Sequence, residues 1–289
     1  MTVGVLRQAA TVVLLRSASS DQARSAPQLE VFLVRRHDNI AFMGGAHVFP
    51  GGRVDAADYL ADAGQVCDGI ATVNARMHDL SADAAIAHHV AATRELFEEA
   101  GILLARRDGA IVSIDADAST RFAAYRQQLV AGTMSLLELA SHERLRFALD
   151  ELGYFAHWVT PEVETKRFDT RFFAAAAPAN QEAAHDDGET THGEWMRPVD
   201  AIARCMEGEI ALPPPTWTTL RQLEAFATVE DAMAWARTRE VPRVQPRLVQ
   251  NGDTRIVSLP GDADCPGVAG FSVRETRFLL SGGRWNPLR

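Results

Sequence analysis

The chain has 289 residues, 47% of them hydrophobic, so it can bury a sizeable core as one large domain or as one domain with an appendage. A formal net charge of −9 argues against nucleic acid or an anionic membrane as the main partner, because both are themselves negatively charged. Three scattered cysteines without a Cys-x-x-Cys pair, and the lack of any apolar run of about 18 residues, favour a reducing cytoplasmic location over secretion or membrane insertion.

The first third of the chain predicts strands followed by one long helix. Strands are expected over residues 10–16, 29–36 and 47–49, which are rich in β-branched and apolar side chains. The last of them breaks into a Pro-Gly-Gly turn at residues 50–52. Residues 53–80 are rich in Ala, Asp and Gly, and we expect a loop with one or two short helices. Ser81 is a good N-cap, so the long helix is expected over residues 82–100.

Helices and strands are mixed in the rest of the chain. Helices are expected over residues 119–130, 135–149, 198–206, 216–226 and 229–238. Strands are expected over residues 154–159, 170–176 and 194–196, with a turn at Pro161 pairing the first two. The tail from residue 241 shows only short β-like runs, at 255–259 and 273–280. This order predicts an α+β fold, in which residues 1–226 form the main domain and residues 227–289 pack on it as an extension.

Three carboxylates are predicted to converge within residues 94–102, whose sequence is RELFEEAGI. Positions i, i+3 and i+4 share one helix face, so Glu95, Glu98 and Glu99 point the same way. At about 5.5 Å and an effective dielectric constant of about 20, each pair would repel by roughly 3 kcal/mol, which suggests a cation between them. Hard divalent cations take oxygen ligands and bring phosphate substrates with them. The alternative is a solvated helix face, where like charges cost only a few tenths of a kcal/mol.

The surroundings of this turn resemble the Nudix box, G…R-E-U-x-E-E-x-G-U, where U is aliphatic. Residues 94–102 match it completely, and Gly52 resembles the glycine that opens the box. Gly52 and Arg94 are 42 positions apart, whereas the usual box has fourteen, so about 28 residues are inserted. The glutamate that usually lies eight residues before the arginine has no clear counterpart, because this chain has Ile86 there. The resemblance covers roughly residues 8–226.

The insertion itself resembles one branch of the Nudix family, the coenzyme A (CoA) and acyl-CoA diphosphatases. Residues 33–52 also resemble the CoA-type signature that precedes the box. The positions that fit are Arg36, Ile40, Gly45 and the Phe-Pro-Gly-Gly of residues 49–52. The usual Thr, Ser and second Arg are replaced by Val34, His37 and Ala41.

The resemblance implies a Nudix-type α/β/α sandwich with a mixed β-sheet, a helical insertion and extra C-terminal helices. It implies metal-dependent hydrolysis of a pyrophosphate linkage in CoA or acyl-CoA, giving 3′,5′-ADP and phosphopantetheine or its acyl form. Mg²⁺ or Mn²⁺ is the expected cofactor. Hydrolysis of ADP-ribose, NADH or another nucleoside diphosphate derivative is the first alternative, and a non-catalytic Nudix-like binding module is the second. A homodimer is left open.

The resemblance also implies roles for individual residues. The expected metal ligands are Glu95, Glu98 and Glu99, of which the last two are also expected to be catalytic, with Arg94 orienting them. The general base is expected from an acidic loop, with Glu189 as the first choice and Glu162 and Glu164 as rivals. Glycines let the backbone approach metal and phosphate, and arginines offer forked donors to phosphate. The expected substrate contacts are Arg35, Arg36, Gly51, Gly52 and Arg167.

Overall fold

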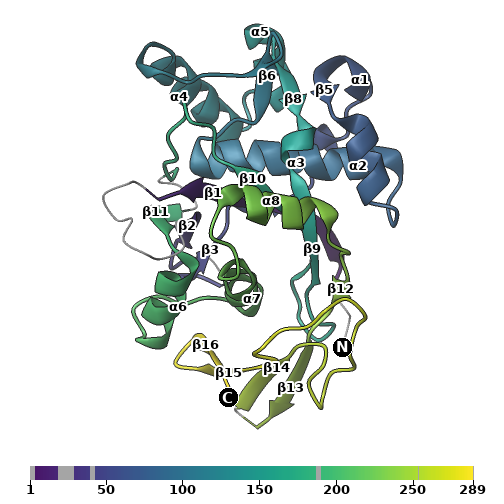
Figure 1. Ribbon diagram of the computed structural model, residues 1–289, viewed down its shortest axis with the longest axis vertical. Coiled ribbons are helices and arrows are strands. Elements are labelled where there is room, and N and C mark those ends of the chain that lie inside the picture. The colour runs from purple at the N-terminus through teal and green to yellow at the C-terminus, as the bar shows by residue number, and fades with distance from the viewer. Residues whose placement is uncertain (1–3, 19–28, 40–42, 187–189, 253, 289) are drawn as a thin grey trace.

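The computed structural model describes residues 4–18, 29–39, 43–186, 190–252 and 254–288. Its central layer is an eight-stranded mixed sheet with strand order β11-β2-β1-β10-β9-β12 (Figure 1). The strands are β1 (Leu6–Ser17), β2 (Leu29–Arg36), β9 (Gly153–Val159), β10 (Arg167–Ala176), β11 (Thr190–Met196) and β12 (Arg243–Val244). Short β3 (His47–Val48) pairs with β2, and β4 (Gly51–Arg53) pairs with β1. The β1–β10 and β9–β12 pairs are parallel, and the others are antiparallel.

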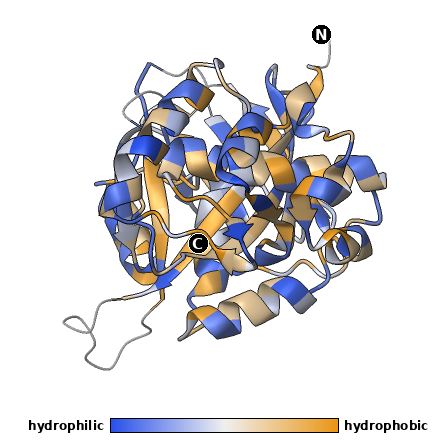
Figure 2. Ribbon diagram, turned by 90° about the horizontal axis from the view of Figure 1, so that it is seen from above, coloured by the Kyte–Doolittle hydropathy of each residue, from blue (hydrophilic) through white to orange (hydrophobic). Residues whose placement is uncertain are grey.

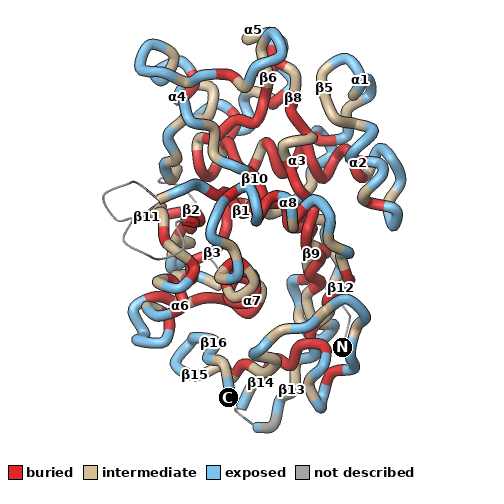
Figure 3. The backbone as a smooth tube through the Cα atoms, viewed as in Figure 1, coloured by how far each residue is buried: buried red, intermediate tan, exposed pale blue. Residues whose placement is uncertain are grey.

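Helices cover both faces of this sheet. Successive side chains along each strand point to opposite faces, so each face carries apolar side chains that helices bury. In β1, Val12 and Leu14 pack toward helix α3 (Ala82–Ala100), whereas Val13 and Leu15 pack toward the opposite face. That opposite face is covered by α6 (Pro198–Met206), α7 (Pro214–Leu223) and α8 (Val229–Thr238). Figure 2 shows the hydrophobic residues concentrated along the central strands, and Figure 3 shows the same strands and α3 as buried. The predicted α+β sandwich with a mixed sheet is therefore confirmed.

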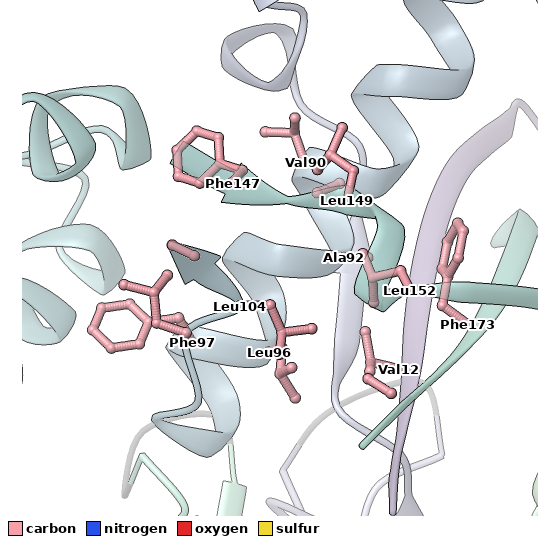
Figure 4. Close-up of a cluster of buried hydrophobic side chains, with 14 of the residues drawn as sticks. Val12, Val90, Ala92, Leu96, Phe97, Leu104, Phe147, Leu149, Leu152 and Phe173 are labelled. Carbon is pink, nitrogen blue, oxygen red and sulfur yellow. The ribbon is translucent and has the colours of Figure 1, made fainter. Parts of the chain in front are cut away.

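The core on the α3 face joins elements that are far apart in the sequence. Figure 4 shows Val12 of β1, Phe173 of β10 and Leu96 of α3 among the same buried side chains. Leu149 and Leu152, from the segment just before β9, belong to the same cluster, with Leu149 near Val90 and Leu152 near Phe173. Close packing of this kind gives α3 a fixed position on the sheet.

The bounds of α3 are those predicted. The Ser81 hydroxyl accepts a hydrogen bond from the Ala84 amide, and Gly101 adopts the left-handed conformation at φ 72° that ends the helix. The insertion before α3 contains a 3₁₀ turn (Ala56–Asp58), helices α1 (Ala63–Val66) and α2 (Ile70–Arg76), and strand β5 (Cys67–Asp68). The expected loop with short helices is confirmed, with one strand in addition.

One predicted helix was wrong. Residues 135–149 form helix α5 (Leu136–Glu143) and then strand β8 (Arg146–Ala148). The helix ends because Arg144 adopts the left-handed conformation, at φ 53°. The strand belongs to a second, four-stranded sheet with the order β5-β8-β6-β7, in which β6 is Ala105–Arg107 and β7 is Ala110–Ile111.

The remaining elements differ from prediction mainly at their ends. Helix α4 (Ala116–Val130) begins three residues earlier than expected, with Asp115 as its N-cap. Helix α7 begins at Pro214, since prolines are tolerated in the first helical turn. After α8, the tail forms an antiparallel sheet of β13 (Arg247–Asn251), β14 (Thr254–Ser258), β15 (Arg277–Ser281) and β16 (Arg284–Pro287). Within the described ranges, no helix combines the length and apolar character that crossing a bilayer requires.

Candidate active site

The last turns of α3 lie directly against the glycine turn that leads into β4. The Gly51 amide donates a hydrogen bond to Oε2 of Glu99, at 2.9 Å. Gly52 packs against the carboxylate of Glu95 so closely that an added Cβ would lie 2.4 Å from Oε1. Any side chain at position 52 would therefore displace Glu95, which is the physical reason for a glycine there. Pairing of β4 with β1 holds this turn in place.

Arg94 ties the carboxylates of this region together. Its Nη1 donates to Oε1 of Glu95 at 2.8 Å and to Oε2 of Glu98 at 3.1 Å. On its other side, Nε and Nη2 donate to the two carboxylate oxygens of Asp58, at 2.9 and 3.0 Å. Nη2 also donates to the carbonyl oxygen of Arg53, at 2.8 Å. The guanidinium thus orients two glutamates of α3 and fixes the strand end at β4.

Asp58 is a site residue that the sequence reasoning missed. It is almost fully buried, and its carboxylate also accepts a hydrogen bond from the Asp55 amide, at 2.8 Å. The position eight residues before Arg94, where the box usually has a glutamate, is Ile86. This count fails because most of the insertion lies between Asp58 and α3. In the usual Nudix box the arginine follows the first glycine by fourteen positions. The glutamate eight positions before the arginine is therefore six positions after the glycine. Counting forward six residues from Gly52 would have found Asp58.

The network is short of positive charge. Among the described residues, Asp58, Glu95 and Glu98 share the single guanidinium of Arg94. Burial raises the pKa of Glu95 to about 7, although Arg94 partly opposes this, and burial also raises the pKa of Glu98. Burial alone would lower the pKa of Arg94, but its hydrogen bonds to Asp58 and the charges of the glutamates raise it above the usual value. An additional cation would stabilise the ionised carboxylates.

The donor set fits a hard divalent cation, although the side chains are not arranged as a finished cage. In the part of the chain that the structure describes, no group of three or more His, Cys, Asp or Glu side chains could hold a metal ion as it stands. Glu95 and Glu98 are turned onto Arg94, and Glu99 is turned onto the Gly51 amide. All three offer carboxylate oxygens from one helix end, which is the ligand chemistry of Mg²⁺ and Mn²⁺. To bind a metal ion, Glu95 and Glu98 would have to give up their hydrogen bonds with Arg94 and turn toward the ion.

Strand alternation separates the two arginines expected to contact substrate. In β2, Val34 packs toward α3 and Leu33 packs toward the opposite face. Arg36 therefore lies on the same face of the sheet as the glutamates, and Arg35 lies on the other face.

The contacts of the two arginines agree with this separation. Arg35 donates to the Asp38 carboxylate at 2.6 Å and to the Thr191 hydroxyl at 3.2 Å. The Nε of Arg36 is buried and has no hydrogen-bond partner among the described residues. Of the pair, Arg36 has the unpartnered guanidinium nitrogen, on the face of the sheet that packs against α3.

Arg167 is not brought to the glutamates. It pairs with Leu6 at the beginning of β1, whereas Gly51 and Gly52 pair further along the same strand. Its guanidinium is buried and donates to the carbonyl oxygen of Thr160, at 3.4 Å. The expected substrate contact has no support in this geometry.

The expected general base, Glu189, lies outside the described residues. Its two rivals lie in the connection between β9 and β10, close to the C-terminal sheet. Glu164 accepts a hydrogen bond from Arg255 at 2.6 Å, and Glu162 accepts one from Gln245 at 3.5 Å. This connection is at the Arg167 end of the sheet, so neither rival is brought to the glutamates of α3.

Comparisons with known proteins give the family of this chain. The family model described as the NUDT19 Nudix domain matches residues 6–223. Acyl-coenzyme A diphosphatase NUDT19 of Xenopus laevis is 25% identical over 276 residues, covering 84% of this chain and 73% of the relative. Its namesake in Homo sapiens is 27% identical over 301 residues, covering 89% and 79%. The crystal structure of a NUDIX hydrolase from Alicyclobacillus acidocaldarius has a TM-score of 0.67 and 28% identity, covering 81% of this chain and 97% of that one. The chain belongs to the Nudix hydrolase family.

Proposed function

We propose that this Nudix hydrolase cleaves the pyrophosphate linkage of CoA or acyl-CoA, releasing 3′,5′-ADP and phosphopantetheine or its acyl form. The observation that carries the proposal is the turn of Glu95, Glu98 and Glu99, held against the Gly51–Gly52 turn by Arg94. The inserted box and the similarity to two acyl-coenzyme A diphosphatases support the choice of substrate. Mg²⁺ or Mn²⁺ is the proposed cofactor, because all the proposed ligands are carboxylates.

The proposed chemistry is attack of water on one phosphorus, with cleavage of the bridging P–O bond and departure of the other phosphate. A divalent cation, when bound, supplies Lewis-acid polarisation and charge neutralisation. Arg94 and Asp58 keep the glutamate side chains oriented, and Gly52 leaves the space that Glu95 fills. Arg36 would bind a phosphate with its forked donors. Glu189 is proposed to take the proton of the attacking water.

A cytoplasmic location is part of the proposal. The three cysteines, Cys67, Cys205 and Cys265, are unpaired and buried, which suits a compartment where thiols stay reduced.

Product analysis by mass spectrometry tests the function. The protein would be given CoA, acetyl-CoA, a long-chain acyl-CoA, ADP-ribose and NADH separately, with Mg²⁺ or Mn²⁺. Glu98→Gln is the inactive variant, and Glu162→Gln is the matched control from the distant β9–β10 connection. We expect 3′,5′-ADP from the CoA compounds with wild type and the control, and none with Glu98→Gln. Cleavage of ADP-ribose or NADH alone would overturn the choice of substrate, and equal turnover by Glu98→Gln would overturn the site.

A further inference from the structure

The C-terminal end of the catalytic helix is bound by a second helix. Helix α4 lies beside the C-terminal end of α3 (Figure 1). The two helices are joined by the edge-to-face contact of Phe122 with Phe97, whose ring centroids are 6.4 Å apart. Arg126 follows Phe122 by one helical turn on α4. It is therefore carried to the end of α3, where the last carbonyl groups of a helix need donors.

Arg126 makes two hydrogen bonds there to main-chain oxygens of different segments. Its Nε donates to the carbonyl oxygen of Glu98 at 2.8 Å, and its Nη2 donates to that of Ala184 at 2.9 Å. The Ala184 amide in turn donates to the carbonyl oxygen of Ala100, at 2.9 Å. One guanidinium thus joins the last turn of α3 to the segment that connects β10 with β11. A cation in this position also complements the negative end of the helix dipole.

The same connecting segment is fastened a second time, by Gln181. Its Oε1 accepts from the Leu103 amide at 2.8 Å, and its Nε2 donates to the Leu103 carbonyl at 3.0 Å. Nε2 also donates to the carbonyl of Val112, at 2.9 Å. Residues 181–184 are therefore held on the chain that leaves α3. The Ala184 amide binds them to Ala100 at the helix end, and Arg126 binds them to the carbonyl oxygen of Glu98.

We propose that Arg126 is a positioning residue of the reaction, which fixes the turn that carries Glu98 and Glu99 by holding its main chain. The inference rests on the proposed function for the role of these two glutamates. Arg126 acts through the backbone of Glu98, so its removal frees the last turn to fray and lets the carboxylates spread over several orientations. Metal affinity and turnover then fall together, while the Michaelis constant for the substrate changes little.

Loss of the positive charge of Arg126 and loss of its hydrogen bonds should change Mn²⁺ affinity in opposite directions, so a measurement of Mn²⁺ binding separates the two effects. A positive charge near carboxylates disfavours a divalent cation, and its removal alone would tighten Mn²⁺ binding. Loss of the two hydrogen bonds would loosen the turn and weaken Mn²⁺ binding. Arg126→Met removes both properties, whereas Arg126→Lys keeps the charge but replaces the planar fork by a single ammonium group.

The test compares Arg126→Met and Arg126→Lys with Arg121→Met, a matched change on the same helix. Arg121 pairs with Glu143 of α5 and serves as the control for loss of an arginine from α4. Mn²⁺ binding without substrate would be measured by titration calorimetry, and amide hydrogen exchange would be followed at Gly101 and Ala184. Steady-state kinetics would give kcat and KM separately.

We expect Arg126→Met to weaken Mn²⁺ binding and lower kcat by roughly tenfold each, the size of a lost charge-assisted hydrogen bond. Exchange at Gly101 and Ala184 should accelerate, Arg126→Lys should recover only part of each loss, and Arg121→Met should match wild type. Unchanged Mn²⁺ binding and exchange in Arg126→Met, or tighter Mn²⁺ binding, would overturn the proposal. The binding and exchange measurements need no substrate, so failure to hydrolyse CoA compounds would overturn the proposed function without deciding this inference.

Discussion

Two arginines, the partly buried Arg94 and the buried Arg171, organise two polar networks in this molecule, and the networks differ in the pKa shifts of their carboxylates. Arg94 at the end of α3 is shared by Asp58, Glu95 and Glu98, and burial raises the pKa of both glutamates. Arg171 on β10 contacts Asp169 and also binds Asp79 at 2.5 Å. Burial alone would raise the pKa of Asp169, but a hydrogen bond with His157 and the charge of Arg171 lower it.

The difference separates a network that holds its carboxylate ionised from one in which burial favours the protonated carboxyl groups. Around Arg171 the carboxylate of Asp169 is held in its ionised form by His157 and Arg171, although the Nε of Arg171 has no hydrogen-bond partner among the described residues. Around Arg94 three carboxylates share one guanidinium, and burial is the main cause of the raised pKa values of Glu95 and Glu98, with neighbouring carboxylates adding to it. Perturbed pKa values of this kind are typical of sites that act on a ligand. The two networks should therefore respond differently to the same substitutions.

The largest expected effect is on stability. Asp169→Asn leaves the buried guanidinium of Arg171 without its nearest carboxylate, which should lower the free energy of unfolding by about 3 kcal/mol. Chemical denaturation measures this, and kcat per folded molecule should stay near the wild-type value. Loss of turnover in fully folded Asp169→Asn protein would show that the Arg171 network also serves the reaction.

The next effect is on activity. Asp58→Asn removes one of the three carboxylate charges that share Arg94. A residue that orients a metal ligand typically contributes roughly 10- to 100-fold to activity. We expect a fall of that size in kcat/KM, with little loss of stability because the network has an excess of carboxylates. Asp55→Asn is the control, since Asp55 lies 3.8 Å from Arg94 and is half exposed. Equal effects of the two variants would argue against the role given to Asp58.

A smaller effect should separate the two arginines of β2. Arg36→Met should raise KM for the substrate by about tenfold, the value of a charge-assisted hydrogen bond to phosphate. Arg35→Met, on the opposite face of the sheet, should leave KM close to wild type. Initial-rate kinetics over a range of substrate concentrations measure both. A larger rise in KM for Arg35→Met would place the phosphate on the other face.

The smallest effect is a difference in how stability depends on pH. Because the pKa of Glu95 is raised to about 7, metal-free protein gains stability from this group at low pH and loses it as the pH rises through about 7. Asp169 has a lowered pKa, so its contribution is present above the unfolded value and is lost as the pH falls through the folded value. Thermal unfolding of metal-free wild type and Glu95→Gln from pH 5 to 8 tests the first statement. The variant should show the weaker decline, and added Mn²⁺ should reduce the decline in wild type.

Local signals explain what the sequence predicted correctly. The bounds of α3 follow from the Ser81 cap and the left-handed Gly101, both of which can be recognised from a few neighbouring residues. The overlong helix at 135–149 failed for the opposite reason. β8 exists because it pairs with β5 and β6, and neither partner can be identified from the residues around position 146.

In the site as well, residues that are close in the sequence were predicted, and residues that are far apart in the sequence were not. Three glutamates on one helix turn are visible in a short window of sequence. Asp58 was missed because the insertion separates it from Arg94, although the spacing from Gly52 would have found it. The Arg171 network could not be predicted, because its members come from a loop and two strands at positions 79, 157, 169 and 171.

The contact between Gly52 and Glu95 has a consequence for how long the chain between the two parts of the Nudix box can be. The two halves of the box meet through side-chain and backbone contacts, so the length of chain between them is not what brings them together. Loop closure depends only weakly on length, with about 0.6 kcal/mol for each doubling of a flexible loop. The chain between Gly52 and Arg94 also has a structural role, because Val73 and Met77 lie buried in the core on the α3 face. The Nudix box, usually one continuous stretch of sequence, is here assembled from two separate segments, the glycine turn at residues 51–52 and the helix end at residues 94–102.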